Sequence, residues 1–183
     1  DNGNAIAVNG KLTGSETSLR THWDPAKPAT AEKTDGLQLE MEFDTGVNLN
    51  KQSVKLNKLS LSTAKGEAKP LTATLAKPMT LALGDLAAAG SDSVLAIQID
   101  RLDLAEWPSF VGHFASAGIA DGTLNLNVSN AGRSFAVSLD STVENLTVTG
   151  ADPKLAGTNL EMAMNGKLDD WQKLAADNLH IAI

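Results

Sequence analysis

Hydrophobic and polar residues alternate along most of this chain, which is the pattern of β-strands that bury one face. The clearest case is residues 37–43, where every second residue is apolar and Gln or Glu stands between them. A Ser-Asn-Ala-Gly-Arg segment at residues 129–133 separates two such runs and predicts a hairpin. Further runs lie at residues 5–12, 54–61, 71–75, 79–83, 94–104, 123–128, 134–139, 143–148, 160–164 and 179–183. The pattern predicts half-buried antiparallel strands.

A longer pattern recurs within this alternation: two apolar-x-apolar units separated by two polar residues. It is complete at residues 54–61 and 97–104, and weaker at residues 141–148 and 174–181. The additional residue would turn the following side chains to the other face of the sheet unless a bulge or a bend absorbs it. Because repeated bent strands build a curved sheet, we expect a mainly β fold: a curved, predominantly antiparallel sheet of about ten strands around an apolar interior, with one or two short helices.

Two segments interrupt the β pattern and predict these helices. Residues 108–117 begin with Pro and are followed by Gly, so we expect a short helix that plugs or flanks one end of the sheet. Residues 169–176 begin with two Asp, which suit a helix N-terminus, and we expect a helix there in preference to a bent strand over residues 174–181. Connections are predicted at residues 27–36, which lack periodicity, and at residues 84–90, which two glycines bound.

The length of 183 residues suits one β-rich domain over residues 1–183. The chain begins with Asp-Asn-Gly-Asn rather than Met, and we expect it to be a segment of a longer protein. No run approaches the roughly 18 apolar residues of a membrane-spanning helix.

Composition narrows the function classes. The net charge of −7 and the absence of a basic cluster disfavour nucleic acid as a partner. Three Trp, four Phe and no Tyr offer few stacking platforms for bases. The absence of Cys excludes disulfides, thiolate catalysis and Cys-based metal sites.

Candidate catalytic and metal-binding residues are few. His22, His113 and His180 show no ligand spacing, so we expect no metal. Asp100, Asp103 and Glu106 crowd one short stretch, where helix capping and solubility explain them better than glycoside hydrolysis. Nucleophile-elbow and phosphate-loop motifs are absent from the sequence. We therefore expect no enzyme activity, no catalytic residue and no cofactor.

The apolar positions of the strands define the expected interior. It should be lined by Leu37, Leu39, Met41, Phe43, Leu124, Leu126, Val128, Leu160, Met162 and Met164. In a sandwich or a barrel this face is the core, whereas in an open curved sheet it is a groove that can receive acyl chains. The Met residues suit an adaptable groove lining or an ordinary core equally well, so the residue pattern leaves both alternatives open.

One part of the sequence resembles a known family. Residues 99–110 combine a Leu-x-Leu strand end with a Pro-containing short helix, and residues 118–126 follow the pattern Gly-x-x-x-Gly-x-Leu-x-Leu. Residues 145–150 and 178–181 resemble further strand starts of the same kind. With these motifs the chain resembles the AsmA-like superfamily of AsmA- and TamB-type proteins in outer-membrane biogenesis.

The resemblance implies a function and a location. It implies a segment in the periplasm of a diderm bacterium, from a parent protein anchored in the inner membrane, with an apolar groove for phospholipid transport between membranes. The expected partners are phospholipid acyl chains, and envelope proteins are a further possibility. The alternative from a different class is a non-catalytic structural or interaction β-sandwich of a surface or secreted protein. A hydrolase that uses the carboxylates of residues 100–106 is a distant third.

Overall fold

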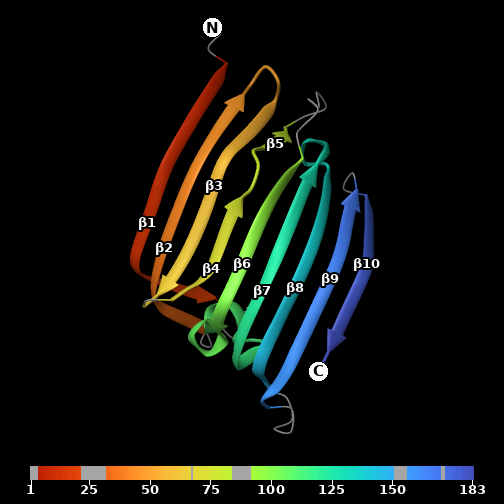
Figure 1. Cartoon of the computed structure of the whole chain (residues 1–183). Coiled ribbons are helices and arrows are strands. Elements are labelled where there is room, and N and C mark those ends of the chain that lie inside the picture. The colour runs from red at the N-terminus through yellow and green to blue at the C-terminus, as the bar shows by residue number, and fades with distance from the viewer. Residues whose placement is uncertain (1–3, 22–31, 67, 84–91, 151–155, 170–171) are drawn as a thin grey trace.

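The computed structural model describes residues 4–21, 32–66, 68–83, 92–150, 156–169 and 172–183 (Figure 1). These residues form a mainly β fold, as predicted, in which one antiparallel sheet contains ten strands. The strands are β1 Ala5–Thr21, β2 Glu32–Asn48, β3 Ser53–Lys65, β4 Ala68–Leu75, β5 Met79–Ala82, β6 Ser93–Asp103, β7 Ala115–Ser129, β8 Ser134–Val148, β9 Thr158–Asp169 and β10 Lys173–Ala182.

The sheet is open rather than closed into a barrel. Its order is β1-β2-β3-β4-β6-β7-β8-β9-β10, and β5 pairs with β3 beyond the end of β4 (Figure 1). Strands β3, β6, β8 and β10 begin at the end drawn at the top of Figure 1, here called the upper end, and run to the lower end. The described residues form one sheet and not two packed sheets, so the β-sandwich architecture is not observed.

Alternation gives the sheet one apolar and one polar face. One row of paired residues crosses all nine strands of the main path and is apolar throughout: Leu12, Met41, Leu61, Ala73, Ile97, Leu124, Leu139, Met164 and Leu179. We call it the central row. The adjacent row on the other face reads Thr13, Glu40, Ser62, Thr72, Gln98, Thr123, Asp140, Ala163 and His180. The period of two therefore separates the faces across the whole sheet.

The recurring pattern coincides with an irregularity in each of its four positions, as predicted for the copies at residues 54–61, 97–104 and 141–148 and against the helix preferred for the fourth. In β3 the register with β2 shifts at Asn57. Lys58 pairs with Asp44 and Leu56 pairs with Thr45, so Asn57 has no partner in β2. The other shifts lie between Ile99 and Leu102 in β6, between Val143 and Leu146 in β8, and between Ala176 and Asn178 in β10. The additional residue keeps the apolar residues before and after it on one face.

The predicted helix at residues 108–117 is shorter than expected. Helix α1 covers Pro108–Val111, directly after a 3-10 turn at Leu104–Glu106, and β7 already begins at Ala115. Ala115 pairs with Val148, and the Thr149 amide donates a hydrogen bond to the Phe114 carbonyl at 3.0 Å. These contacts extend the β7–β8 ladder to residues 114 and 115, so the helix ends early.

The second predicted helix, at residues 169–176, is wrong. Residues 173–182 form strand β10, which pairs with β9 from Lys173 opposite Asp169 onward, so the bent-strand alternative holds there. A helix of two turns is marginal alone, whereas the ladder with β9 supplies a hydrogen-bond partner along the strand. Residues 170–171 lie outside the described residues.

Two further predictions need correction. Residues 32–36 were expected in a loop but belong to β2, where Thr34 pairs with Leu19 of β1. Residues 134–139 and 143–148 were expected as two strands but form the single strand β8. The hairpin predicted at residues 129–133 is confirmed, with a 3-10 turn at Asn130–Gly132. The expected connection at residues 84–90 and residues 27–31 of the expected loop lie outside the described residues.

A buried cluster closes the lower end of the apolar face. It consists of Leu37, Leu102, Leu104, Trp107, Ala115 and Ala120. Helix α1 holds β1 and β2 against this cluster through Ser109, which is fully buried. The Ser109 hydroxyl donates to the Leu19 carbonyl (2.7 Å), and its amide donates to the Thr34 hydroxyl (3.1 Å). The expectation that this helix plugs or flanks one end of the sheet is consistent with these contacts.

Candidate functional site

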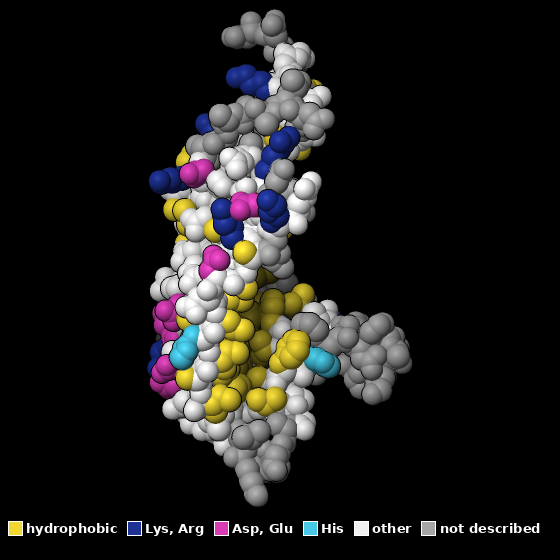
Figure 2. Space-filling model, turned by 90° about the vertical axis from the view of Figure 1, so that its right-hand side faces the viewer, with side chains coloured by type: hydrophobic (Ala, Val, Ile, Leu, Met, Phe, Trp, Pro, Cys, Tyr) yellow, Lys and Arg dark blue, Asp and Glu magenta, His cyan; other side chains and the backbone are white. Residues whose placement is uncertain are grey.

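The candidate site is the part of the apolar face above the buried cluster, here called the trough. Figure 2, viewed from the β10 side, shows hydrophobic side chains lining a hollow on one side of the sheet, in the middle and lower part of the view. Most side chains of the central row are neither fully buried nor fully exposed. At the two edge strands, Leu12 and Leu179 are 58% and 62% exposed. An apolar face that its own chain leaves partly uncovered is a candidate binding surface.

The upper end of the trough contains a pocket of about 530 Å³, here called the upper pocket. On one side, Leu81 of β5 lies against the 3-10 turn between β7 and β8, where a Cβ on Gly132 would come within 2.7 Å of its side chain. The pocket is lined by Leu56, Leu59, Leu75, Met79, Leu81, Ala82, Leu83, Leu95, Leu126, Val128, Gly132 and Phe135. Its volume falls in the range of small-molecule sites, and its lining is almost entirely hydrocarbon.

The structure places nine of the ten predicted lining residues on the trough side above or beside the buried cluster. Met41, Leu124 and Met164 belong to the central row, and the next row down contains Leu39 and Met162. The next row up contains Phe43 and Leu126. Leu126 and Val128 line the upper pocket. Leu160 lies near the lower end, where it pairs with Val143.

The tenth predicted residue, Leu37, has a different environment. It is only 2% exposed and belongs to the buried cluster under α1, so a ligand in the trough cannot contact it. Met79, which the sequence suggested as a Met suited to a groove lining, does line the upper pocket. Sequence reasoning did not single out Leu56, Leu81 and Phe135, which also line it. All three lie within runs that alternate, so the period of two was the signal that could have found them.

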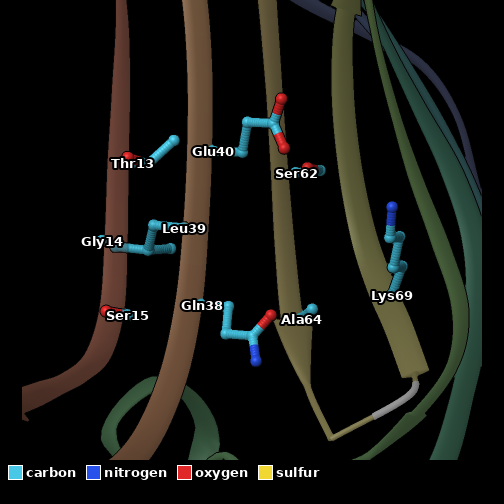
Figure 3. A pocket seen from close by; sticks show the side chains of 9 residues that line it. All are labelled: Thr13, Gly14, Ser15, Gln38, Leu39, Glu40, Ser62, Ala64 and Lys69. Atoms are coloured by element: carbon cyan, nitrogen blue, oxygen red, sulfur yellow. The ribbon is translucent and has the colours of Figure 1, made fainter.

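The polar face carries a second, smaller hollow of about 280 Å³ (Figure 3). Side chains of Gln38, Glu40, Ser62 and Lys69 from three strands lie around it. The Glu40 carboxylate accepts a hydrogen bond from the Lys11 ammonium at 2.5 Å, so its charge is already compensated.

Ion pairs on this face stabilise the ordinary charged forms. The hydrogen bond from Lys58 is the main cause that lowers the pKa of Glu42, and the hydrogen bond with Glu40 is the main cause that raises the pKa of Lys11. A general acid or base that works near neutral pH needs the opposite shifts. These groups therefore show the electrostatics of a solvated surface.

Two of the three carboxylates at residues 100–106 have local structural partners. The Asp103 carboxylate accepts a hydrogen bond from the Ala105 amide at 3.0 Å and caps the 3-10 turn. Glu106 lies 3.7 Å from the Lys65 ammonium. Across the part of the chain that the structure describes, no three His, Asp or Glu side chains gather as a metal site requires. No described helix is long and apolar enough to cross a membrane.

Comparisons with known proteins add no relative. No protein-family model matches the chain, and neither a curated protein nor a solved structure matches it. The trough and the sequence motifs are therefore the features from which a function can be inferred.

Proposed function

We propose that this protein binds phospholipid acyl chains in the trough, as a periplasmic segment of an AsmA-like protein that transports lipid between membranes in outer-membrane biogenesis. The observation that carries the proposal is the central row, which is apolar in all nine strands of the main path and, except for the buried Ala73, remains partly exposed. The motifs at residues 99–110 and 118–126 support the family.

The energetics favour an acyl chain as the occupant. Each methylene group that leaves water for an apolar surface contributes roughly 0.8 kcal/mol. Several methylenes in the upper pocket and along the central row would give useful affinity without any polar contact. Because a hydrocarbon lining offers similar contacts at every position, no single position holds the chain strongly, which suits a carrier that must release its cargo.

An interaction module that covers the trough with a partner protein remains the second candidate. The exposed apolar residues of both edge strands favour it, since Ile6 and Val8 of β1 and Ile181 of β10 are 54%, 46% and 54% exposed. Edge strands with exposed apolar residues tend to pair with other chains.

The test is native mass spectrometry of the protein purified from a bacterial periplasm, followed by organic extraction of the bound material. We expect phospholipid at a defined ratio. We also expect Leu126→Asp to remain folded and to lose the lipid, because a carboxylate on the trough side stays partly hydrated but repels hydrocarbon. Asn127→Asp is the matched control, since it adds the same carboxylate at an exposed position on the other face.

Three results would oppose the proposal. Protein that is free of lipid, and that takes none up on challenge with phospholipid vesicles, contradicts acyl-chain binding and favours the interaction module. Lipid binding by Leu126→Asp at the wild-type level removes this residue from the site. Unfolding of Leu126→Asp alone would indicate that the upper pocket is a sealed core.

A further inference from the structure

Charge is unevenly distributed along the strand direction. Above the central row, the described side chains include eight Lys and Arg and five Asp and Glu. Below it, they include five Lys and Arg and ten Asp and Glu. The described side chains of the upper half therefore sum to a charge of about +3 and those of the lower half to about −5, in a chain whose full sequence has a net charge of −7. Figure 2 shows most of the basic side chains of this view in the upper half, with acidic side chains among them, and further acidic side chains along the lower part of the sheet.

The upper pocket lies at the basic end. Lys77 stands two residues before Met79, which lines the pocket, and the Lys77 carbonyl accepts a hydrogen bond from the buried Ser93 hydroxyl at 2.6 Å. This bond fixes the backbone that carries Lys77 beside the pocket. Arg133 follows Gly132 of the lining on the opposite side. The Lys77 side chain is exposed, and among the described residues no acid forms an ion pair with it.

The lower end of the trough is already occupied by the protein itself. The cluster around Leu104 and Trp107 is buried, and the hydrogen bonds of Ser109 hold α1 across it. Acidic residues surround this end, including Asp100, Asp103 and Glu106. A bound hydrocarbon chain can therefore extend down the trough from the upper pocket, but where the buried cluster lies, over β2, β6 and β7, its polar end cannot take the lower end without displacing that cluster.

We propose that the upper pocket is the head-group end of the site and that the protein selects amphiphiles with a negatively charged head group, a phosphate or a carboxylate. This inference rests on the proposed function. The tail lies in the trough and the anionic head group lies in solvent beside Lys77. The field of the upper half attracts a negative head group, and the field of the lower half repels it, so the two halves together orient the molecule.

The first experiment compares amphiphiles with the same sixteen-carbon tail and different head groups. The probes are lysophosphatidylglycerol, palmitate, lysophosphatidylcholine and hexadecyltrimethylammonium, used below their critical micelle concentrations. We expect the two anionic probes to bind about fivefold or more tightly than the zwitterionic probe at low salt, and the difference to shrink as salt screens the charges. The relative affinities of lysophosphatidylglycerol and palmitate distinguish a phosphate-bearing lipid from a free fatty acid.

Two variants on one strand provide the control for position. Lys77 follows the upper end of β4 and Lys69 lies near its lower end, and both are exposed. We expect Lys77→Glu to reduce the preference for anionic probes at least threefold, because it reverses a charge beside the pocket. Lys69→Glu makes the same change in net charge at the other end and should leave the preference within the error of the wild-type value.

The orientation can be measured directly because the chain has no Cys. A fluorophore is attached to a single Cys introduced as Leu83→Cys in the upper pocket or as Val148→Cys at the lower end of β8. A probe with a nitroxide on its head group should quench the fluorophore at residue 83 and not the one at residue 148.

The outcomes separate the two proposals. Equal affinity for all four head groups, or stronger quenching at residue 148, overturns the head-group inference and leaves acyl-chain binding intact. Failure of every probe to bind overturns the proposed function as well.

Discussion

Replacement of Gly122 by Ala should destabilise the sheet, because β7 and β8 approach each other closely at this position. A Cβ on Gly122 would lie 2.7 Å from the Asp140 carbonyl oxygen, 2.8 Å from the Ser141 Cβ and 3.0 Å from the Ser141 Cα. Two of these atoms belong to the backbone of a paired strand, so no side-chain rotation relieves the contact. Overpacking of this kind costs about 1–3 kcal/mol, and the usual gain of about 0.5–1 kcal/mol for Gly→Ala in a strand offsets part of it.

The net loss is therefore about 1–2 kcal/mol of unfolding free energy, measured by urea denaturation monitored by circular dichroism. With a typical urea dependence of about 2 kcal/mol per molar, the midpoint should fall by about 0.5–1 M. Gly46→Ala is the matched control, since the nearest atom to its Cβ would be the Ile6 carbonyl oxygen at 3.9 Å, an ordinary contact. If Gly122→Ala is as stable as Gly46→Ala, the close approach of β7 and β8 does not constrain this residue and the reasoning is wrong.

Three further predictions concern the lower end, a bulge and the polar face. Ser109→Ala should cost about 1–3 kcal/mol in urea unfolding, because the Leu19 carbonyl loses its buried donor; an unchanged midpoint would show that α1 is held by packing alone. Arg101 has a φ of 49°, in the left-handed region that Gly adopts without cost. Arg101→Gly should therefore equal or exceed the wild type in thermal stability, whereas Arg101→Val should lose about 1–2 kcal/mol. Equal melting temperatures of the two variants would contradict a left-handed bulge at this residue. The pKa of Glu42 is lowered from its ordinary value mainly by the Lys58 hydrogen bond, so its contribution to stability is present above that ordinary value and is lost as the pH falls through the folded-state pKa. Urea midpoints of the wild type and Glu42→Gln should therefore differ near pH 6 and converge near pH 3, and a constant difference would exclude this linkage.

The sequence predicted the sheet because its signals are local. The alternation at residues 37–43 assigns each side chain to a face without reference to any other strand, and the polar pairs within the recurring pattern mark where strands bulge. The single strand β8 was divided in two because Ser141 interrupts its apolar positions. Ser141 pairs with Gly122, at the close approach where a large side chain has no room.

The wrong predictions have a nonlocal cause. Two Asp residues at positions 169 and 170 predict a helix start, but the ladder between β9 and β10 determines the conformation of residues 173–182. The lower end of the trough depends on Ser109, whose hydrogen-bond partners lie 75 and 90 residues away along the chain. No pattern within one segment contains that information, and for the same reason the burial of Leu37 under α1 could not be separated from the trough-lining role predicted for it.

The bulges and the charge distribution together limit what can occupy the trough. The four recurring bulges lie on β3, β6, β8 and β10, which all run in the same direction, and each bulge increases the local bend of its strand. A flat sheet cannot pack well against a concave face, because face-to-face packing requires two surfaces of similar twist. An extended hydrocarbon chain has no fixed shape and can follow the curve from the upper pocket along the central row. The shape of the apolar face therefore favours a flexible chain over a second sheet, and the basic upper end favours a chain with an anionic head group.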